Sequence, residues 1–372
     1  MKTVDGIYTS AKIFTDNIED YALAQIRQLC DQRAFQGSKI RIMPDVHPGK
    51  VGTIGFTATF RKMLMPLVLG IDIGCGISLV KLREKRVEFQ KLDRIIREQI
   101  PAGTQIRKKP HPLSGVPDLE HLRCFRHIKE EKARLSIGSL GGGNHFIEID
   151  RDEEGGLYAT VHSGSRRLGK DVTEYYLKEG QKILKQSGIE IPYELTYLEG
   201  DLLSDYLYDL EIVQEFACIN REAILREMIK GMKWKAGEFL SVPHNYVEQN
   251  LQGGWIVRKG AISAKEGEPV VIPVNMRDGI LLGTGLGSQE WNCSAPHGAG
   301  RILKREEVGK HYTTAQFKEQ MKGIYTTCIG KDTLDEAPFA YRSLEEIQGA
   351  IEETVVIRKI LKPVYNFKAG GR

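Results

Sequence analysis

Five residues of the kinds that bind transition metals are spread along the chain, each beside a tight turn. Asp72 and Cys75 lie among glycines, His145 follows three glycines, His162 opens a Ser-Gly-Ser turn, and His244 follows a proline. Most of them end an apolar run, and strand ends that lead into turns are where a rigid scaffold presents functional groups. If the five meet, the chain must fold as one large interleaved domain, although 372 residues alone would suggest two or three domains.

The donor types of these residues indicate a metal site. Carboxylate, thiolate and imidazole groups all bind divalent transition metals, and one thiolate can bridge two ions. Any single histidine is more often structural than a ligand, but four of the nine histidines, His297 included, occupy similar settings. Soft thiolate favours zinc over manganese, so ligand chemistry alone predicts a zinc-type site.

A second motif, Asn292-Cys-Ser-Ala-Pro-His-Gly-Ala-Gly-Arg301, presents one histidine in a glycine-rich turn. Gly298 and Gly300 remove bulk beside His297, so backbone N–H groups can close around an anion. Arg301 adds a cationic fork suited to phosphate. A histidine placed in this way can act as a nucleophile on phosphorus, and the alternative is a loop histidine that caps a turn.

Composition restricts the setting of the chain. Hydrophobic residues make up 41% of it, yet no apolar run approaches the roughly 20 residues that span a bilayer. The amino terminus has no apolar signal region. Six cysteines without paired spacing fit reduced thiols, so we expect a cytoplasmic protein without membrane association. A net charge of +4 permits an anionic partner without requiring one.

The apolar pattern predicts a mixed α/β (α+β) fold. We expect an amphipathic helix after Thr15 as N-cap, a helix with an apolar stripe from Phe89 that stops at Pro101, and a helix after the Ser343 cap that pairs with Glu346. Strands are expected over 40–42, 51–60, 65–80 and 255–283. Residues 168–231 read as mostly helical. The prediction is a single domain over 1–372 with central sheets, a helical insertion and a deep metal-lined cleft.

With these residues in place, the chain resembles the RtcB family of RNA ligases. The resemblance runs from Met43-Pro-Asp-Val-His-Pro-Gly49 to Phe367-Lys-Ala369. Between these ends the family's blocks occur in order, at Gly70–Gly76, Gly141–Glu148, His162–Arg167, His244–Asn245, Arg258–Ala261 and Ser294–Arg301. Six ordered blocks are a specific match. The chain looks like a compact bacterial-type member.

The resemblance implies an activity and its cofactors. Members join RNA 3′-phosphate or 2′,3′-cyclic phosphate ends to 5′-hydroxyl ends, using GTP and two Mn²⁺ ions. His297 corresponds to the histidine that becomes guanylylated, and Asp72, Cys75, His145, His162 and His244 correspond to the metal ligands, with Cys75 shared. RNA repair or tRNA splicing is the implied role, and archease-type activator proteins assist some relatives.

The resemblance also implies contacts to GTP. Glu148 and Lys368 are expected to read the guanine edge, and Tyr341 to present an aromatic face to the base, against a plain core position for Tyr341. The implied set is Asn144, His145, Phe146, Ile147, Glu148, His244, Asn245, Pro273, Val274, Asn275, Met276, His297, Gly298, Ala299, Gly300, Tyr341 and Lys368. The stretch Pro273–Met276 departs from the family's Pro-Gly-Ser-Met-type turn, and Ile280 stands where a serine is usual.

Further polar residues have two open interpretations. Asp45 and His47 are either partners that orient the metal centre or parts of a turn. The candidates for contacts to RNA or to the triphosphate, against ordinary surface charge, are Arg166, Arg167, Arg258, Lys259 and Arg301. Two rival functions remain: a zinc-type phosphoester hydrolase, which needs neither His297 nor Lys368, and a non-catalytic RNA-binding protein, which the altered 273–276 stretch favours.

Overall fold

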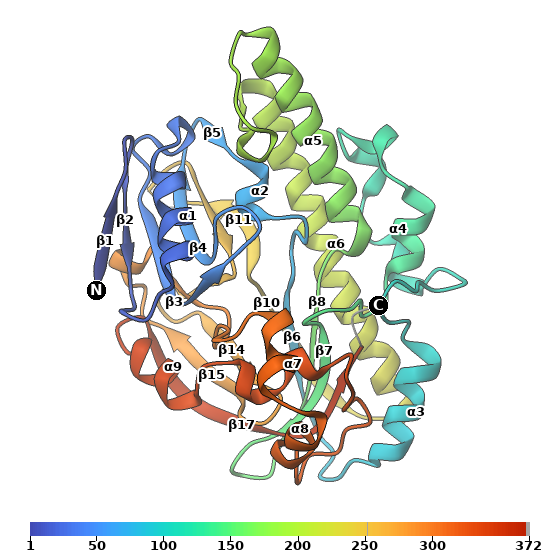
Figure 1. The fold of residues 1–372 in the computed structure, drawn as a ribbon. Helices are drawn as coiled ribbons and strands as arrows, with labels where there is room; N and C mark the ends of the chain where they lie inside the picture. The colour runs from blue at the N-terminus through green and yellow to red at the C-terminus, as the bar shows by residue number, and fades with distance from the viewer. Residues whose placement is uncertain (251, 370–372) are drawn as a thin grey trace.

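Two large β-sheets form the centre of the computed structural model, which describes residues 1–250 and 252–369 (Figure 1). The six-stranded sheet has the order β1 (Lys2–Asp5), β2 (Ser10–Ile13), β3 (Ile40–Pro48), β4 (Thr53–Phe60), β12 (Trp255–Lys259) and β11 (Asn245–Gln249). The seven-stranded sheet has the order β10 (Ala236–Pro243), β6 (Gly76–Leu82), β8 (Leu157–Ser163), β7 (Phe146–Arg151), β17 (Val355–Lys368), β15 (Gly279–Gly285) and β14 (Pro269–Asn275). Two small pairs join β13 (Ala261–Ser263) to β16 (Ser294–Pro296) and β5 (Met63–Leu64) to β9 (Leu198–Glu199).

Helices cover and connect these sheets. They are α1 (Asp20–Cys30), α2 (Pro66–Leu69), α3 (Phe89–Gln99), α4 (Glu130–Ser136), α5 (Arg166–Gln186), α6 (Gly200–Met232), α7 (Arg305–His311), α8 (Thr314–Gln320) and α9 (Leu344–Ala350). Short 3-10 helices are η1 (Arg33–Phe35), η2 (Pro112–Gly115), η3 (Leu119–His121), η4 (Phe125–His127), η5 (Tyr193–Leu195), η6 (Gln289–Trp291), η7 (Leu334–Glu336) and η8 (Pro338–Ala340). The fold is therefore mixed α/β with several sheets. The long helices α5 and α6 lie side by side and extend beyond the sheets at the top of Figure 1.

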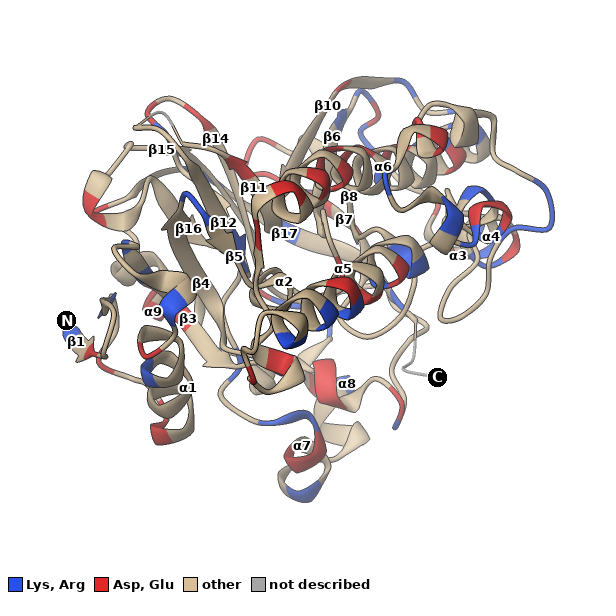
Figure 2. Ribbon diagram, turned by 90° about the horizontal axis from the view of Figure 1, so that it is seen from above, with Lys and Arg blue, Asp and Glu red and all other residues tan. Residues whose placement is uncertain are grey.

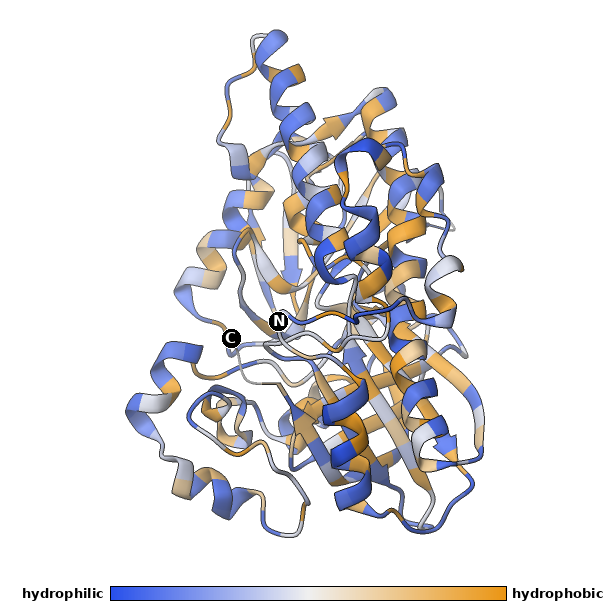
Figure 3. Ribbon diagram, turned by 90° about the vertical axis from the view of Figure 1, so that its right-hand side faces the viewer, coloured by the Kyte–Doolittle hydropathy of each residue, from blue (hydrophilic) through white to orange (hydrophobic). Residues whose placement is uncertain are grey.

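Several sequence expectations are confirmed. The stripe in α3 buries Leu92, Ile95 and Ile96, and the helix ends at Gln99, before Pro101. Ser343 caps α9, because its side chain accepts a hydrogen bond from the backbone N–H of Glu346 at 3.2 Å. The helical pattern expected within 168–231 is present as α5 and α6. Figure 3 shows hydrophobic and hydrophilic residues alternating along the helices, as expected where one face of a helix packs and the other meets solvent.

Two expectations are wrong. Thr15 does not cap α1, which begins at Asp20; the Thr15 hydroxyl instead accepts from the N–H of Asn17 at 3.1 Å in a local turn. The stretch 65–80 is not one strand. Pro66 at the first helical position favours a turn of helix, α2, and β6 begins only at Gly76. The segment between them is a loop that carries Asp72 and Cys75.

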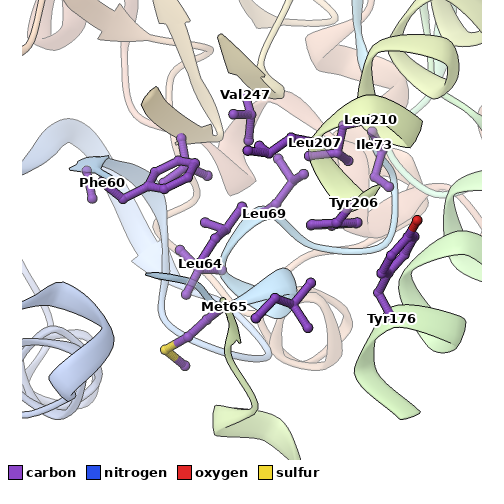
Figure 4. Close-up of a cluster of buried hydrophobic side chains, with 14 of the residues drawn as sticks. Phe60, Leu64, Met65, Leu69, Ile73, Tyr176, Tyr206, Leu207, Leu210 and Val247 are labelled. Atoms are coloured by element: carbon purple, nitrogen blue, oxygen red, sulfur yellow. The ribbon is translucent and has the colours of Figure 1, made fainter. Parts of the chain in front are cut away.

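A buried apolar cluster anchors this loop to α6. Leu69 and Ile73 are fully buried with Leu210 of α6, and Figure 4 shows them in one cluster with Tyr176 and Tyr206. Each leucine or isoleucine side chain removed from water contributes about 1.5–3 kcal/mol. The backbone on both sides of Asp72 is therefore held by core packing.

Figure 2 colours the charged residues, which are dense on the helices and also occur on strands such as β7, β12 and β17. None of the helices among the described residues is both long and apolar enough to cross a membrane.

Candidate functional site

Four of the five expected metal ligands meet at the ends of four neighbouring strands of the seven-stranded sheet. Cys75 directly precedes β6 and His145 directly precedes β7, while His162 lies near the end of β8 and His244 follows β10. These four strands are neighbours in the sheet, and the register pairs His162 with Phe146 and with Ile77. The sheet therefore gathers residues that are far apart in sequence.

Asp72 completes two overlapping groups of donor atoms. One group is Cys75, His162 and His244, the other is Asp72, Cys75 and His145, and the donor atoms within each lie within 4.8 Å of one another. Cys75 belongs to both groups. Its Sγ lies 3.3 Å from His162 Nε2 and 3.5 Å from His145 Nε2. His145 Nε2 lies 3.1 Å from Asp72 Oδ2, and His162 Nε2 lies 3.4 Å from His244 Nε2.

The hydrogen bonds of Nδ1 in His145 and His162 determine that Nε2 of each ring faces the cluster. His145 Nδ1 contacts the carbonyl oxygen of Leu140 at 2.8 Å, and His162 Nδ1 contacts that of Asn144 at 3.1 Å. A nitrogen that faces a carbonyl oxygen must carry the proton, so each Nε2 keeps its lone pair. Three Nε2 atoms, a thiol and a carboxylate converging in this way fit two divalent cations that share the sulfur.

Burial sets the protonation of these donors. It lowers the pKa of His162 and of His244 well below the ordinary value, so both rings are neutral. Burial and the charge of Asp72 raise the pKa of Cys75 well above its ordinary value. Burial opposes ionisation of Asp72, but the neighbouring His145, Cys75 and Arg166 together lower its pKa to about 2. A cation bound here must displace the thiol proton of Cys75.

Helix α6 contacts the segments that carry the cluster. The sequence did not indicate this role, because α6 contains none of the expected ligands. The buried amide oxygen of Asn220 accepts from the N–H groups of Gly138 and Ser139 at 2.8 and 3.2 Å. The guanidinium of Arg221 donates to the carbonyl oxygens of Gly74 and Ser163 at 2.7 and 3.0 Å. These bonds tie the loops that carry Cys75, His145 and His162 to one helix.

His297 lies beside the cluster and is held by Asp45. Its Nδ1 contacts Asp45 Oδ2 at 2.7 Å, and its ring centroid is 4.7 Å from that of His244. Asp45 lies on β3 and is fully buried. Since a carboxylate accepts, Nδ1 is the protonated nitrogen and Nε2 carries the free lone pair. Of the two interpretations for Asp45, the geometry favours the orienting role, although its partner is His297 rather than a metal ligand.

His47 and Gly300 complete the surroundings of Asp45. His47 Nδ1 contacts the backbone oxygen of Asp45 at 3.0 Å, and burial lowers the pKa of His47 to about 4. Gly300 has φ +71°, and a Cβ there would lie 2.4 Å from the same backbone oxygen. Only glycine lets the turn after His297 pass this close to β3.

A cleft opens from His297 and encloses about 760 Å³, part of it open to solvent. The expected GTP-contacting residues that line it are Asn144, Phe146, Glu148, His244, Pro273, Val274, Asn275, Met276, His297, Gly298, Gly300, Tyr341 and Lys368. The structure does not bring Ile147 or Ala299 into the lining, because both side chains are buried in apolar clusters.

The remaining two expected contacts lie next to the cleft. His145 belongs to the metal candidate cluster. Asn245 is used in the backbone framework, since its Oδ1 accepts from the N–H of Gly260 at 2.9 Å and its Nδ2 donates to the carbonyl oxygen of Asp72 at 3.3 Å. In the altered stretch, Asn275 Oδ1 accepts from the N–H groups of Arg277 and Asp278 at 3.0 and 2.9 Å and forms a turn. The Asn275 side chain is therefore already bonded within the turn.

The far end of the cleft is organised by Glu336, which sequence reasoning missed. Its buried carboxylate accepts from Lys368, from the hydroxyl of Tyr341 at 2.6 Å, from Arg301 at 3.2 Å and from Arg305. Burial raises the pKa of Glu336, but the charges of Lys368, Arg305 and Arg301 outweigh burial and lower it to about 2. Tyr341 lines the cleft and also packs against two apolar clusters, and its contact with a base stays a prediction. No periodicity or motif distinguished Glu336 among the chain's acidic residues.

The five basic candidates for phosphate contacts have different environments. Arg167 is half exposed and pairs with Asp171, Arg166 bonds to Gly103 beside the cluster, and Arg301 lines the cleft. Arg258 and Lys259 correct the prediction, because both are buried away from solvent and from the cleft lining.

The contacts of these two residues explain their burial. Arg258 bonds to Glu248, Tyr246 and Ser294 at 2.6, 2.9 and 2.8 Å. Lys259 donates to the carbonyl oxygens of Val51 and Leu67, and burial lowers its pKa to about 8. Both cations brace the fold.

Replacing Arg258 by alanine is expected to lower the free energy of unfolding by about 3–5 kcal/mol. The change leaves Glu248 Oε1 and several buried acceptors without their donor, and only Lys265 remains on Glu248 Oε2. Urea denaturation measures this loss. The control is Arg226→Ala, which removes a largely exposed pair with Glu222 and should cost less than about 1 kcal/mol. A normally stable Arg258→Ala protein would show that this cation is not structural.

A cluster of metal-binding donors beside a carboxylate-held histidine, at one end of a cleft, is an arrangement typical of metal-dependent enzymes. Comparison with known proteins gives its family. The family model described as tRNA-splicing ligase RtcB matches residues 25–122 and 114–369. The chain therefore belongs to the RtcB family of RNA-splicing ligases, and it is an enzyme.

Individual relatives agree over nearly their whole lengths. The chain is 29% identical over 364 residues to RNA-splicing ligase RtcB1 of Escherichia coli strain ATCC 25922, which covers 87% of this chain and 88% of the relative. Identity to RNA-splicing ligase RtcB of Escherichia coli K12 is 28% with the same coverage. Identity to tRNA-splicing ligase RtcB of Methanococcus maripaludis is 26% over 451 residues, which covers 97% of this chain and 94% of the relative.

Proposed function

We propose that this enzyme joins RNA 3′-phosphate or 2′,3′-cyclic phosphate ends to 5′-hydroxyl ends through a histidine–GMP adduct, using GTP and two Mn²⁺ ions. The observation that carries the proposal is the free Nε2 of His297. Asp45 holds the opposite ring nitrogen at 2.7 Å, and the histidine lines the cleft beside the donor cluster. A phosphoester hydrolase needs no nucleophile in this position.

In the first step, His297 Nε2 attacks the α-phosphorus of GTP. A new N–P bond forms, the bond to the β-phosphate bridging oxygen breaks, and pyrophosphate leaves. The Nδ1–H of His297 stays hydrogen-bonded to Asp45, whose carboxylate stabilises the positive charge that develops on the ring. Because Asp45 fixes the tautomer, the nucleophile needs no separate base.

In the second step, an oxygen of the RNA 3′-phosphate attacks the phosphorus of the adduct and releases His297. In the third step, the 5′-hydroxyl attacks the RNA phosphate, loses its proton, and displaces GMP. A 2′,3′-cyclic phosphate must first be opened by water. His297 therefore returns to its neutral form after each cycle.

The residues that would hold the two ions are Asp72, Cys75, His145, His162 and His244. Bound divalent cations supply Lewis acidity that neutralises the phosphate oxygens and lowers the pKa of water. Manganese rests on the family assignment, since the thiol and imidazole donors also suit zinc.

Recognition of the nucleotide is assigned to the rest of the cleft. Glu148 and Lys368 would read the guanine edge, and Tyr341 would contact the base. Arg301, with Arg166 and Arg167 nearer the surface, would contact phosphates of RNA or of GTP. We place all of residues 1–372 in one catalytic domain, of which residue 251 and residues 370–372 lie outside the described part. The proposed setting is RNA repair or tRNA splicing in the cytoplasm, where an archease-type activator is a further partner.

Joining of RNAs with defined ends tests the proposal. With GTP and Mn²⁺, an RNA ending in a 3′-phosphate should be joined to one that begins with a 5′-hydroxyl, and the 2′,3′-cyclic phosphate form should be joined too. A matched pair with 3′-hydroxyl and 5′-phosphate ends should not react. Removal of the terminal phosphate without joining would instead support a hydrolase, and binding without either reaction would support an accessory protein.

Replacing Asp45 by asparagine is expected to slow formation of the GMP adduct roughly a hundredfold to ten-thousandfold. An amide cannot stabilise the charged ring, and it can hold the wrong tautomer. The rate is measured in a single turnover by quenching and intact-protein mass. A thermal unfolding scan checks that the variant is folded, and a rate within threefold or so of the parent would contradict the orienting role.

A further inference from the structure

Two carboxyl groups lie together at the base end of the cleft. Glu148 and Asp150 occupy alternate positions on β7, so their side chains point to the same face of the sheet. They are 3% and 0% exposed. Glu148 lines the cleft and was expected to read the guanine edge, whereas no role was expected for Asp150.

Each carboxyl group has one oxygen occupied and one oxygen free. Asn366 on β17 donates to Glu148 Oε2 at 2.6 Å, and the hydroxyl of Thr160 on β8 donates to Asp150 Oδ2 at 2.8 Å. Glu148 Oε1 and Asp150 Oδ1 have no donor among the residues that the structure describes. The two carboxyl groups are close enough to share a hydrogen bond, so a proton held between them satisfies both oxygens, and two buried carboxylates this close cannot both ionise cheaply.

The surrounding charges leave the pair with one proton near neutral pH. Burial and then Asp150 raise the pKa of Glu148 well above its ordinary value, and burial raises the pKa of Asp150 to about 6. The cation of Lys368 on β17 acts in the opposite direction on Glu148, but it is already bonded to Glu336 of η7. Arg301 and Arg305 also bind Glu336, and the hydroxyl of Tyr158 on β8 is bonded to Asp152.

A protonated Glu148 conflicts with its expected role of accepting hydrogen bonds from the guanine edge. A guanine edge presents two N–H donors, from N1 and from the exocyclic amine, and it requires an ionised acceptor. Glu148 must therefore lose its proton when the base binds. We propose that Asp150 is a positioning residue for base recognition, which takes the proton from Glu148 so that the ionised Glu148 accepts from the guanine edge.

The transfer balances within the pair. The O–H bond of Glu148 breaks, an O–H bond forms on Asp150 Oδ1, and the pair keeps one proton and one negative charge. Asn366 stays bonded to Glu148 Oε2 and Thr160 to Asp150 Oδ2 during the transfer, and the guanine N–H groups become further donors to the ionised Glu148. Near neutral pH, binding of guanine then exchanges no proton with solvent. Below about pH 6 both groups are protonated in the free enzyme, and binding must release one proton.

Nucleotide binding without turnover tests this inference, which rests on the proposed use of GTP. The probe is the non-transferable analogue guanosine 5′-(α,β-methylene)triphosphate, added to protein already equilibrated with Mn²⁺ so that the thiol proton displaced by the metal is not counted. Calorimetry from about pH 5 to about pH 8.5, in two buffers of different ionisation enthalpy, gives the affinity and the number of protons released. The proteins are the parent, Asp150→Asn, and the control Asp152→Asn, which changes a buried aspartate that follows β7 outside the cleft.

The parent and the Asp152→Asn control should bind with nearly constant affinity above about pH 6, releasing almost no proton at neutral pH. In Asp150→Asn burial, the largest cause of the raised pKa, still keeps a proton on Glu148 while Asp150 no longer takes it up, so neutral binding should release up to about one proton and weaken about tenfold. Its affinity should rise with pH and recover toward that of the parent, which simple structural damage would not produce. Equal affinity profiles and proton counts in the parent and Asp150→Asn would overturn the inference. A parent that binds no guanosine nucleotide at any pH would instead contradict the proposed function.

Discussion

Replacing His297 by alanine is expected to reduce RNA joining by at least about a thousandfold, the largest effect we expect from any single change. Its Nε2 is the only nitrogen of the ring left free once Asp45 holds Nδ1 at 2.7 Å. Alanine removes the nucleophile. The ring of His244 lies nearby, with its centroid 4.7 Å from that of His297, but it cannot replace His297 because it belongs to the donor cluster. Joining is measured with an end-labelled RNA that carries a 3′-phosphate and a partner RNA that begins with a 5′-hydroxyl.

An assay of the last reaction step alone distinguishes loss of the nucleophile from damage to the rest of the site. An RNA that already carries the activated end, RNA 3′-pp-5′-guanosine, needs only attack by the 5′-hydroxyl. The His297→Ala variant should still join this RNA at a rate comparable to the parent, since the donor cluster is intact. Joining of ordinary 3′-phosphate RNA by the variant at the parent's rate would exclude a histidine adduct. Failure on both RNAs would indicate damage to the cluster instead.

Replacing Cys75 by serine should have the second largest effect, through the metal. The sulfur belongs to both donor groups and lies 3.3 and 3.5 Å from two ligand nitrogens. A serine hydroxyl does not ionise at neutral pH and bridges cations poorly, so Mn²⁺ affinity should fall by more than about a hundredfold. Adduct formation and RNA joining should fall with it.

Metal content by mass spectrometry and the thermal shift on adding Mn²⁺ measure this loss directly. The matched control is Cys218→Ser, because Cys218 is a partly exposed cysteine on α6 outside both donor groups. The control should bind metal as the parent does. A Cys75→Ser variant that retains both ions and its activity would contradict the shared sulfur. Measurement with Zn²⁺ beside Mn²⁺ also shows which metal supports the adduct.

The metal candidate cluster was predictable from sequence because its residues carry their own chemical signal. Asp72, Cys75, His145 and His162 stand beside glycine- or serine-rich turns, His244 follows a proline, and the ordered blocks of the family resemblance agree with them. The sequence could not say which ring nitrogen of each histidine faces inward. That choice depends on carbonyl oxygens such as Leu140 O and Asn144 O, which come near only in the folded sheet.

The failures have a common physical cause. A buried and an exposed arginine look alike in sequence, so Arg258 was expected at the RNA and is instead bonded to Glu248 inside the protein. Glu336 and Asp150 carry no motif, and their importance comes from the groups that the fold places around them. The strand expected over 65–80 failed because Pro66 and the glycines around Asp72 favour a helical turn and a loop.

The most direct test of the proposed chemistry is the intact mass of the protein after incubation with GTP and Mn²⁺, beside the His297→Ala variant. A gain of one GMP by the parent alone, stable to alkali and released by acid as a phosphoramidate should be, is the predicted result. A parent that binds metal and yet gains no GMP, or a His297→Ala variant that gains it equally, would contradict the histidine–GMP mechanism.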